Sequence, residues 1–321
     1  MSEVTSEYRH TPVLLAECLE HLQLKPQNTF VDATLGGAGH SLEAATQLAP
    51  GGVLIGIDQD EAAHAAASER LNAIPVEQRP QIELMRGNFG DLDELLMSAE
   101  VPGVDAFLFD LGVSSPQLDQ QARGFSFRGD GPLDMRMDPG NQTLTAVEVI
   151  NTYNAADLAR IIRMYSEEKW ASRIADFIVR EREKAPITTA DQLVEVIKAA
   201  IPASARRAGG HPAKRTFQAI RIEVNSELTV LKRGLEAAVR WLNPGGRLVV
   251  ISYHSLEDRI VKEVFRAGAQ RCTCPPDLPV CVCGNEPILE IVTRKPIAPT
   301  PEEIERNPRA RSAKLRVARK L

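Results

Sequence analysis

Short apolar runs alternate with helix-forming stretches along the first third of the chain, and this rhythm limits the fold more than any other feature. The apolar runs cover residues 29–33, 53–58, 82–85 and 104–110, and polar side chains do not alternate regularly within them. Segments with helical patterning cover residues 13–22, 41–47 and 61–71. Apolar strands joined by helices are typical of a parallel sheet that is covered on both faces. The sequence therefore predicts an α/β fold with a doubly wound, Rossmann-like sheet.

The strand–helix rhythm stops after the fourth apolar run. Residues 118–216 show no convincing strand, only helical stretches at 157–163, 167–184 and 190–200. The rhythm returns with a helix at 224–241, an Asn-Pro-Gly-Gly turn at 243–246, and strands at 247–252 and 288–293. We therefore expect a discontinuous main domain, residues 1–118 and 217–321, an inserted helical domain, residues 119–216, and a basic tail, residues 307–321.

Composition and the N-terminus predict where the protein works. Apolar residues make up 43% of the chain and charged residues 25%, as in a globular protein with a core. The first 12 residues are polar and lack the basic-then-apolar layout of a signal peptide. No apolar run approaches the roughly 18 residues that would span a bilayer. We expect a cytoplasmic protein with no membrane partner.

Basic residues gather in two stretches although the net charge is −5. Neither residues 196–222 nor residues 307–321 contain an acid. Their cations include Lys214, Arg215 and Arg221 in the first stretch, and Arg309 and Arg311 in the second. Local basic stretches on an acidic protein indicate a polyanionic partner. A solvated face and a frayed tail explain the charges equally well.

A glycine turn follows the first predicted strand and favours a nucleoside cofactor. Asp32, Thr34 and the segment Gly36, Gly37, Ala38, Gly39 and His40 form the pattern D-x-T-x-G-G-x-G-H. Asp58 ends the next strand, about 20 residues on, where a carboxylate can bind both ribose hydroxyls. Phe89, after the third strand, could lie against adenine or only pack in the core.

The same turn favours S-adenosylmethionine over a dinucleotide. Its glycine spacing does not match G-x-G-x-x-G, and Asp32 would repel a pyrophosphate. The sulfonium and amine of S-adenosylmethionine are cationic, so nearby carboxylates suit them. Asp32 could equally serve as a residue that stabilises the turn.

Polar residues after two later strands are candidates for the chemistry. Asp110 ends the fourth strand, and Ser114 and Ser115 follow it. An exocyclic aromatic amine is a weak nucleophile, so a methyl acceptor of that kind needs hydrogen-bond acceptors such as these. His254 follows strand 247–252 at the same edge of the sheet. The serines could instead stabilise their own turn, and His254 could cap the next helix.

Four cysteines form a C-x-C-x6-C-x-C pattern: Cys272, Cys274, Cys281 and Cys283. Clustered thiols suggest structural zinc, but the C-x-C spacing is less usual than C-x-x-C. We assign no metal ligand from the sequence and leave zinc open.

Longer motifs resemble those of one family, the RsmH family, also called MraW. They are HTPVLLAE at 10–17, the turn ending in GAGH, DLGVSSPQLD at 110–119, RGFSFRGDGPLDMRMD at 123–138, HPAKRTFQAIRIEVNSEL at 211–228, SYHSLEDRIVK at 252–262 and NPRARSAKLR at 307–316. The resemblance follows nearly the whole chain in order.

The resemblance implies a class I methyltransferase domain with a helical insertion that helps to recognise RNA. The implied reaction is methylation of the N4 amino group of cytidine 1402 in the decoding region of 16S ribosomal RNA. The implied cofactor contacts are Ala38, Gly39, His40, Asp58, Phe89, Asp110 and Gln117. The expected partner is small-subunit RNA in an assembled or assembling 30S subunit, and the oligomeric state stays open, a homodimer included.

One departure affects the base-binding site. Many amino-methyltransferases carry an acid or Asn followed by Pro-Pro and an aromatic residue. The segment after Asp110 has neither the double proline nor the aromatic residue. The residue that stacks on the base therefore stays open, with Phe125 and Phe127 as candidates. Rival interpretations are a nicotinamide-dependent oxidoreductase, a non-catalytic RNA-binding assembly factor and a small-molecule N-methyltransferase.

Overall fold

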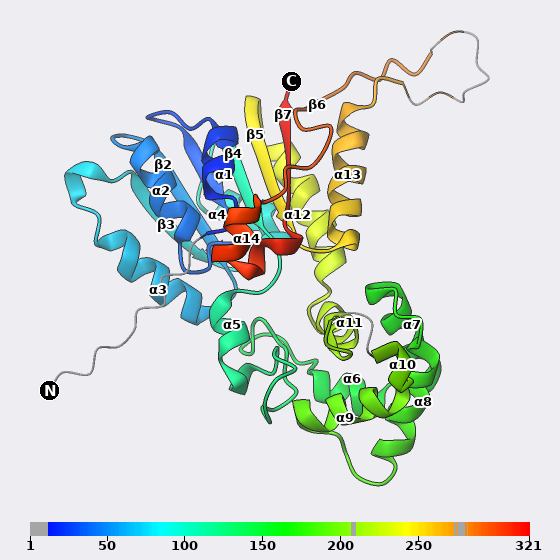
Figure 1. Cartoon of the computed structure of the whole chain (residues 1–321). Coiled ribbons are helices and arrows are strands. Elements are labelled where there is room, and N and C mark those ends of the chain that lie inside the picture. The colour runs from blue at the N-terminus through cyan, green and yellow to red at the C-terminus, as the bar shows by residue number, and fades with distance from the viewer. Residues whose placement is uncertain (1–11, 207–209, 273, 275–279, 281) are drawn as a thin grey trace, which may run out of the picture. The chain divides into compact units, whose positions relative to one another are not determined.

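The chain forms two compact units in the computed structural model (Figure 1). The structure describes residues 12–206, 210–272, 274, 280 and 282–321. The first unit consists of Met1–Gly112 and Thr229–Leu321, and the second of Val113–Leu228. The segment 119–216, which we predicted as an insertion, falls within the second unit.

A sheet of seven strands forms the centre of the first unit, in the order β3-β2-β1-β4-β5-β7-β6. The strands are β1 (Thr29–Asp32), β2 (Val53–Asp58), β3 (Gln81–Arg86), β4 (Val104–Asp110), β5 (Leu242–Ser252), β6 (Leu289–Ile291) and β7 (Lys314–Lys320). Strands β1 to β5 are parallel, whereas β7 is antiparallel to both β5 and β6. The predicted doubly wound sheet is confirmed, and its strand order reverses between β1 and β4.

Helices cover both faces of this sheet. They are α1 (Leu15–Leu22), α2 (Gly39–Leu48), α3 (Glu61–Asn72), α4 (Leu92–Ser98), α12 (Glu227–Trp241), α13 (Ser255–Ala269) and α14 (Pro301–Arg306). Phe30 and Leu54 point into one apolar core with α1 and α2, while Val31 and Ile55 point into the other with α4 and α12. Because neighbouring strand residues face opposite sides, apolar residues at consecutive positions require a layer of helices on each side.

Strand β7 was missed by the sequence analysis, which placed the last strand at 288–293 and a tail after it. Residues 308–312 form the short helix η4 (Pro308–Ser312), and Lys314–Lys320 then enters the sheet between β5 and β6. Leu315 and Val317 are fully buried there. The basic residues that hid this strand are accommodated by partners, such as Asp258 for Arg316.

Two other predicted boundaries differ from the structure. The helix predicted at 224–241 breaks at Ser226, whose φ of 50° ends α11 (Lys214–Asn225) before α12 begins. The predicted turn at 243–246 lies inside β5 as a bulge, because Leu242 pairs with Val104 and Arg247 with Ala106.

The second unit is helical in the part that the structure describes. Its helices are α5 (Ser115–Asp119), α6 (Ala146–Thr152), α7 (Ala155–Ser166), α8 (Ala171–Arg182), α9 (Ala190–Ala200), α10 (Ala203–Arg206) and α11. They enclose a core of their own, which includes Phe125, Leu158 and Phe217. Short 3-10 helices lie at Val76–Gln78 and Phe89–Asp91 in the first unit and at Gln121–Arg123 in the second. No described helix in either unit has the length and apolar character needed to cross a membrane.

Candidate active site

Three aspartates end neighbouring strands of the parallel part of the sheet. Asp32, Asp58 and Asp110 are the last residues of β1, β2 and β4, and β1 lies between the other two strands. In open α/β sheets, ligands bind outside the carboxyl ends of the strands, where the strand order reverses. The reversal between β1 and β4 places Asp32 and Asp110 on either side of that point.

The turn after β1 connects two of these aspartates. Gly36 adopts a φ of 50°, and its amide donates to Asp58 Oδ2 at 2.9 Å. The second carboxylate oxygen of Asp58 accepts from the Asp60 amide, also at 2.9 Å. Each oxygen keeps further lone-pair capacity, since a carboxylate oxygen accepts more than one hydrogen bond. Asp58 therefore holds the turn in place and can still accept hydroxyl groups of a ligand.

Asp32 has a structural role in the turn. Its Oδ1 accepts from the Thr34 amide at 3.2 Å, and its Oδ2 accepts from the Ser41 hydroxyl at 2.6 Å. The side chain is buried, so little of it is open to a ligand. Of the two roles left open for Asp32 by the sequence, the structure shows the stabilisation of the turn.

Asp110 is held by residues from three separate segments. Its Oδ1 accepts from the Tyr253 hydroxyl at 2.7 Å, and its amide donates to Thr34 Oγ1 at 2.7 Å. His40 Nδ1, on the first turn of α2, lies 3.8 Å from Asp110 Oδ2. The other nitrogen of His40 lies 3.0 Å from the carbonyl oxygen of Val13, which requires a hydrogen on that nitrogen. His40 is thus buried between Val13, which precedes α1, and Asp110.

Tyr253 is a site residue that the sequence did not predict. The polar residue predicted after strand 247–252 is its neighbour, His254. β5 pairs with β4 in parallel, so Tyr253, one residue beyond β5, comes next to the end of β4. The sequence signal that could have identified Tyr253 is its position directly after the predicted strand 247–252.

His254 forms the N-cap of α13. Its Nδ1 accepts from the Glu257 amide at 3.4 Å, and Glu257 Oε2 accepts from the amides of Tyr253 and His254. His254 Nε2 lies 3.0 Å from Glu257 Oε1. The helix-capping alternative for His254 is therefore present in the structure, and a catalytic role for it stays a prediction.

Burial raises the pKa of all three strand-ending aspartates. Hydrogen bonds from Ser41 to Asp32 and from the Asp60 and Gly36 amides to Asp58 offset part of that effect. At Asp110 it is offset first by the nearby His40 and then by the hydrogen bond from Tyr253. Within the described part of the chain, no lysine or arginine forms an ion pair with any of the three. Desolvated carboxylates that have no lysine or arginine partner favour a ligand that carries positive charge.

The remaining predicted cofactor residues of the first unit have packing roles. A Cβ atom on Gly39 would lie 2.6 Å from the Pro12 ring, so the close approach there requires glycine. Ala38, with a φ of 58°, is the N-cap of α2, and the Gly37 carbonyl accepts from Arg70. Phe89 packs edge-on against Phe109, with ring centroids 5.6 Å apart. Their contacts with a cofactor stay predictions.

Ser114, Ser115 and Gln117 belong to the second unit. Gln117 is buried on α5, and its Oε1 accepts from the Ser114 amide at 3.1 Å. Ser115 is the first residue of α5. Of the two phenylalanines left open for base stacking, Phe125 is buried, whereas Phe127 stacks on His211 with centroids 4.5 Å apart.

The basic residues of the sequence differ in how they are paired. Lys214 and Arg215 are exposed on α11, and Arg215 lies 3.7 Å from Glu168. Arg221 instead forms a bidentate pair with Glu227, at 2.7 and 2.8 Å. Its guanidinium is largely taken up by this pair, so we leave Arg221 out of the proposed RNA contacts. Arg309 and Arg311 are exposed on η4.

A groove of about 850 Å³ next to α13, β6 and β7 gathers further cations. We call it the basic groove. One acid, Glu290, lines it together with six cations: Lys262, Arg266, Arg271, Arg294, Arg316 and Arg319. Lys262 and Arg316 pair with Asp258, and Arg319 pairs with Glu290. Arg266, Arg271 and Arg294 form no ion pair with the described residues. This groove was not predicted from the sequence, because its cations come from separate segments.

The comparison with known families identifies the family to which the chain belongs. Residues 7–321 match the model of the MraW methylase family. The chain belongs to this family. It is 55% identical over 314 residues to the ribosomal RNA small subunit methyltransferase H of Symbiobacterium thermophilum, covering 98% of this chain and 97% of that protein. It is 52% identical over 320 residues to the protein of the same name from a Paenibacillus strain, covering 98% and 100%.

Membership confirms three predictions from the sequence. The resemblance to the MraW family was correct, and the first unit is a Rossmann-like class I methyltransferase domain. The cofactor of this domain is S-adenosylmethionine. The acidic strand ends are the part of the unit that suits its cationic groups.

Proposed function

We propose that this MraW-family protein transfers the methyl group of S-adenosylmethionine to the N4 amino group of cytidine 1402 in 16S ribosomal RNA. The observation that carries the proposal is the set of aspartates at the ends of β1, β2 and β4. Asp32 is buried, Asp58 and Asp110 are half-buried, and none of them has a lysine or arginine partner among the described residues. A donor with a sulfonium and an ammonium group supplies the missing positive charge. The similarity to small-subunit methyltransferases supports ribosomal RNA as the substrate class.

The proposed cofactor site follows the turn and the strand ends. Asp58 accepts the ribose hydroxyls, while the turn at Gly37, Ala38, Gly39 and His40 lies along the donor. Asp110 faces the cationic part of the donor, Phe89 lies near the adenine, and Gln117 completes the site. These assignments place each group of the donor next to the residue type that binds it.

The transfer is a direct displacement. The N4 nitrogen forms a bond to the methyl carbon as the carbon–sulfur bond breaks, which leaves a neutral thioether and a nitrogen with one proton to lose. Asp110, Ser114, Ser115 and His254 are the proposed hydrogen-bond acceptors that orient the amine and draw on its protons. A carboxylate whose pKa is raised, as that of Asp110 is, accepts a proton more readily than an ordinary one.

The proposed RNA contacts are exposed cations on both units. Lys214 and Arg215 lie on the second unit, Arg309 and Arg311 lie on the first, and the basic groove adds Arg266, Arg271 and Arg294. Contacts of this kind bind phosphates and position the RNA without reading its sequence. We propose a 30S subunit or its precursor in the cytoplasm as the partner, with residues 119–216 helping to recognise it.

The test measures methyl transfer directly. Purified protein is incubated with labelled S-adenosylmethionine and with either naked 16S RNA or 30S subunits, and the product is located by mass spectrometry of nuclease fragments. We expect one N4-methylcytidine at the decoding region. Label on another base, no label with either substrate, or stabilisation by a nicotinamide dinucleotide in place of S-adenosylmethionine would contradict the proposal.

An isosteric variant tests the cofactor site. Asp58→Asn should weaken S-adenosylmethionine binding about 10-fold or more, because a hydrogen bond to a charged group contributes about 1.5–3 kcal/mol. Glu61→Gln, an exposed acid three positions along the chain, is the matched control and should keep wild-type affinity. Isothermal titration calorimetry measures both. Equal affinities for Asp58→Asn and wild type would remove Asp58 from the site.

A further inference from the structure

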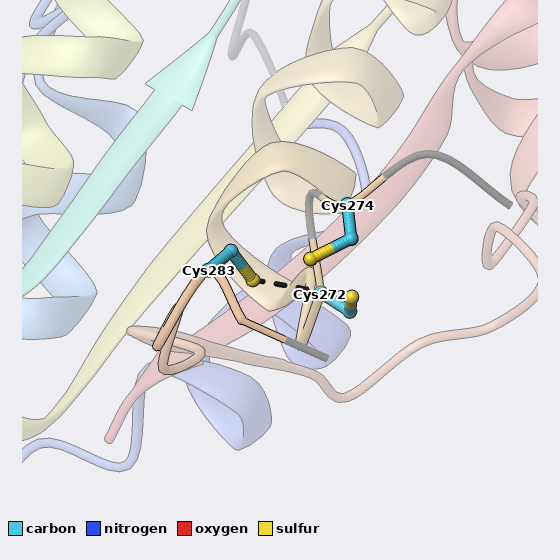
Figure 2. Close-up of side chains that lie close together, drawn as sticks. All are labelled: Cys272, Cys274 and Cys283. Carbon is cyan, nitrogen blue, oxygen red and sulfur yellow. Dashed lines mark hydrogen bonds between the residues drawn. The ribbon is translucent and has the colours of Figure 1, made fainter. Parts of the chain in front are cut away.

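Three cysteines meet in the segment that joins α13 to β6. Figure 2 shows Cys272, Cys274 and Cys283, which we call the thiol cluster. Their three sulfur atoms all lie within 4.8 Å of one another. The sulfurs of Cys283 and Cys272, 11 positions apart in the sequence, are separated by 3.9 Å. Cys281, the remaining cysteine of the sequence pattern, lies outside the described residues.

The spacing of these sulfurs fits a metal and not a disulfide. A disulfide requires an S–S distance of about 2.05 Å. Tetrahedral zinc with Zn–S bonds of about 2.3 Å places neighbouring sulfurs about 3.8 Å apart. The Cys272–Cys283 distance of 3.9 Å already matches one edge of such a tetrahedron. We propose that the thiol cluster binds one Zn²⁺ through the thiolates of Cys272, Cys274 and Cys283.

Hydrogen bonds hold the ligands in place without the metal. The Val282 amide donates to Cys274 Sγ at 3.4 Å, which is a contact that stabilises negative charge on a thiolate. The Gln270 side chain donates to the Cys272 carbonyl at 2.7 Å, and the Asn285 side chain donates to the Gln270 carbonyl. The two ends of the segment are thus connected beside the cluster, so that the ligands from both ends face each other.

The segment also needs a cross-link, because its described side chains bury little apolar surface. Val280 is 69% exposed and Val282 is 76% exposed. A short segment without a core of its own is commonly stabilised by a structural metal. The bound metal would fix both the segment and Arg271, the neighbour of Cys272, which lines the basic groove.

The proposed metal is structural. Helix α13 starts just after β5, at the edge of the sheet where Asp110 lies, and runs for 15 residues toward the opposite edge. At about 1.5 Å per residue, its far end is about 22 Å from its start. The thiol cluster follows that far end, so a metal there does not touch the reacting atoms.

Metal analysis of the full chain tests the proposal. The protein is purified with a reductant and without a polyhistidine tag, incubated with a zinc salt, and freed of excess metal. We expect about one zinc per chain in the wild type. Cys272→Ser and Cys283→Ser should each lower the zinc content at least tenfold. Cys18→Ala, at a buried cysteine of α1, is the control and should retain the metal.

Cobalt provides a second readout that reports the ligands. Co²⁺ bound to the wild type should give the near-ultraviolet absorption of thiolate-to-cobalt charge transfer, and the intensity should fall when Cys274 is changed to serine. A wild type that holds no zinc after loading would overturn the proposal. So would zinc retained by Cys272→Ser, or a disulfide between Cys272 and Cys283 in protein kept under reducing conditions.

Discussion

Two carboxylates, one in the fold and one at the proposed binding site, differ in how their charge is compensated. Asp258 and Asp110 are both desolvated, yet their pKa values shift in opposite directions. Burial alone raises the pKa of Asp258, but Arg316 at 2.6 Å and Lys262 at 3.2 Å outweigh it and bring the pKa below its usual range. Burial prevails at Asp110, where His40 at 3.8 Å and a hydrogen bond from Tyr253 offset only part of it. The first carboxylate stabilises the fold, and the second is the one that we propose to face a cationic ligand.

This difference predicts opposite pH dependences for two amide variants. The pKa of Asp110 is higher in the folded protein than in the unfolded chain, so its contribution to stability is complete below about pH 3.9 and is lost as pH rises through the folded value. Asp110→Asn removes the charge and keeps an oxygen that accepts from Tyr253. We expect its melting temperature to match the wild type below about pH 3.9, to exceed it as pH rises through the folded pKa, and to keep that excess up to about pH 8.

Asp258→Asn is the matched comparison for this measurement. The Asp258 carboxylate contributes to the stability of the fold at any pH above its pKa in the unfolded chain. This contribution is lost as pH falls through its pKa in the folded protein. Asp258→Asn should therefore be less stable than the wild type at neutral pH. Removing one partner of a buried ion pair costs about 3–5 kcal/mol. Scanning calorimetry between about pH 2 and about pH 8 measures both variants. An Asp110→Asn variant that is less stable than the wild type at pH 8 would contradict the proposed balance at that site.

Elements differ in how far the sequence determines them. The strands ending at Asp58 and Asp110 could be predicted, because burial on both faces leaves long apolar runs. Strand β7 could not, since its Arg316 and Arg319 are matched by Asp258 and Glu290, which are distant in the sequence. The same limit applies to the site. Strand ends identify the aspartates, but only the pairing of β4 with β5 brings Tyr253 to Asp110.

The break between α11 and α12 gives a prediction at this scale. Ser226 ends α11 with a φ of 50°, a conformation that costs a non-glycine residue about 1–2 kcal/mol. Ser226→Gly should raise the free energy of unfolding by up to about 1 kcal/mol, since glycine removes this strain but loses more backbone entropy. Ser226→Val should lower it by about 1 kcal/mol or more, because a β-branched residue tolerates this conformation poorly. Urea denaturation measures both.

The opposite result would also be informative. The sequence predicted an unbroken helix at 224–241, and glycine inside a helix destabilises it by about 0.5–1 kcal/mol relative to alanine. If Ser226→Gly is less stable than the wild type and Ser226→Val is not, then the helix is continuous in solution. That result would contradict the separation of α11 and α12 at Ser226.

At the scale of the whole molecule, an acidic protein must bind a polyanion through local surfaces. The net charge of −5 gives no general attraction to RNA. In the basic groove, Arg266, Arg271 and Arg294 have no ion pair with the described residues, so their charge is available to phosphates. The positive charges of the other three cations are paired with acids: Lys262 and Arg316 with Asp258, and Arg319 with Glu290. The groove therefore offers about three phosphate contacts rather than six.

Salt dependence can count these contacts. Each phosphate contact on single-stranded nucleic acid contributes about 0.7 to the slope of log affinity against log salt concentration. Arg266→Glu and Arg294→Glu should each lower this slope by about 0.7 or more and weaken RNA binding at every salt concentration below about 0.2 M. Lys232→Glu, an exposed cation on α12 beside Glu236 and outside the groove, should leave the slope unchanged. Filter binding or fluorescence anisotropy with a decoding-region RNA provides the measurement. If the groove variants keep the wild-type slope while Lys214→Glu and Arg215→Glu lower it, the RNA is bound by the second unit and the groove has another use.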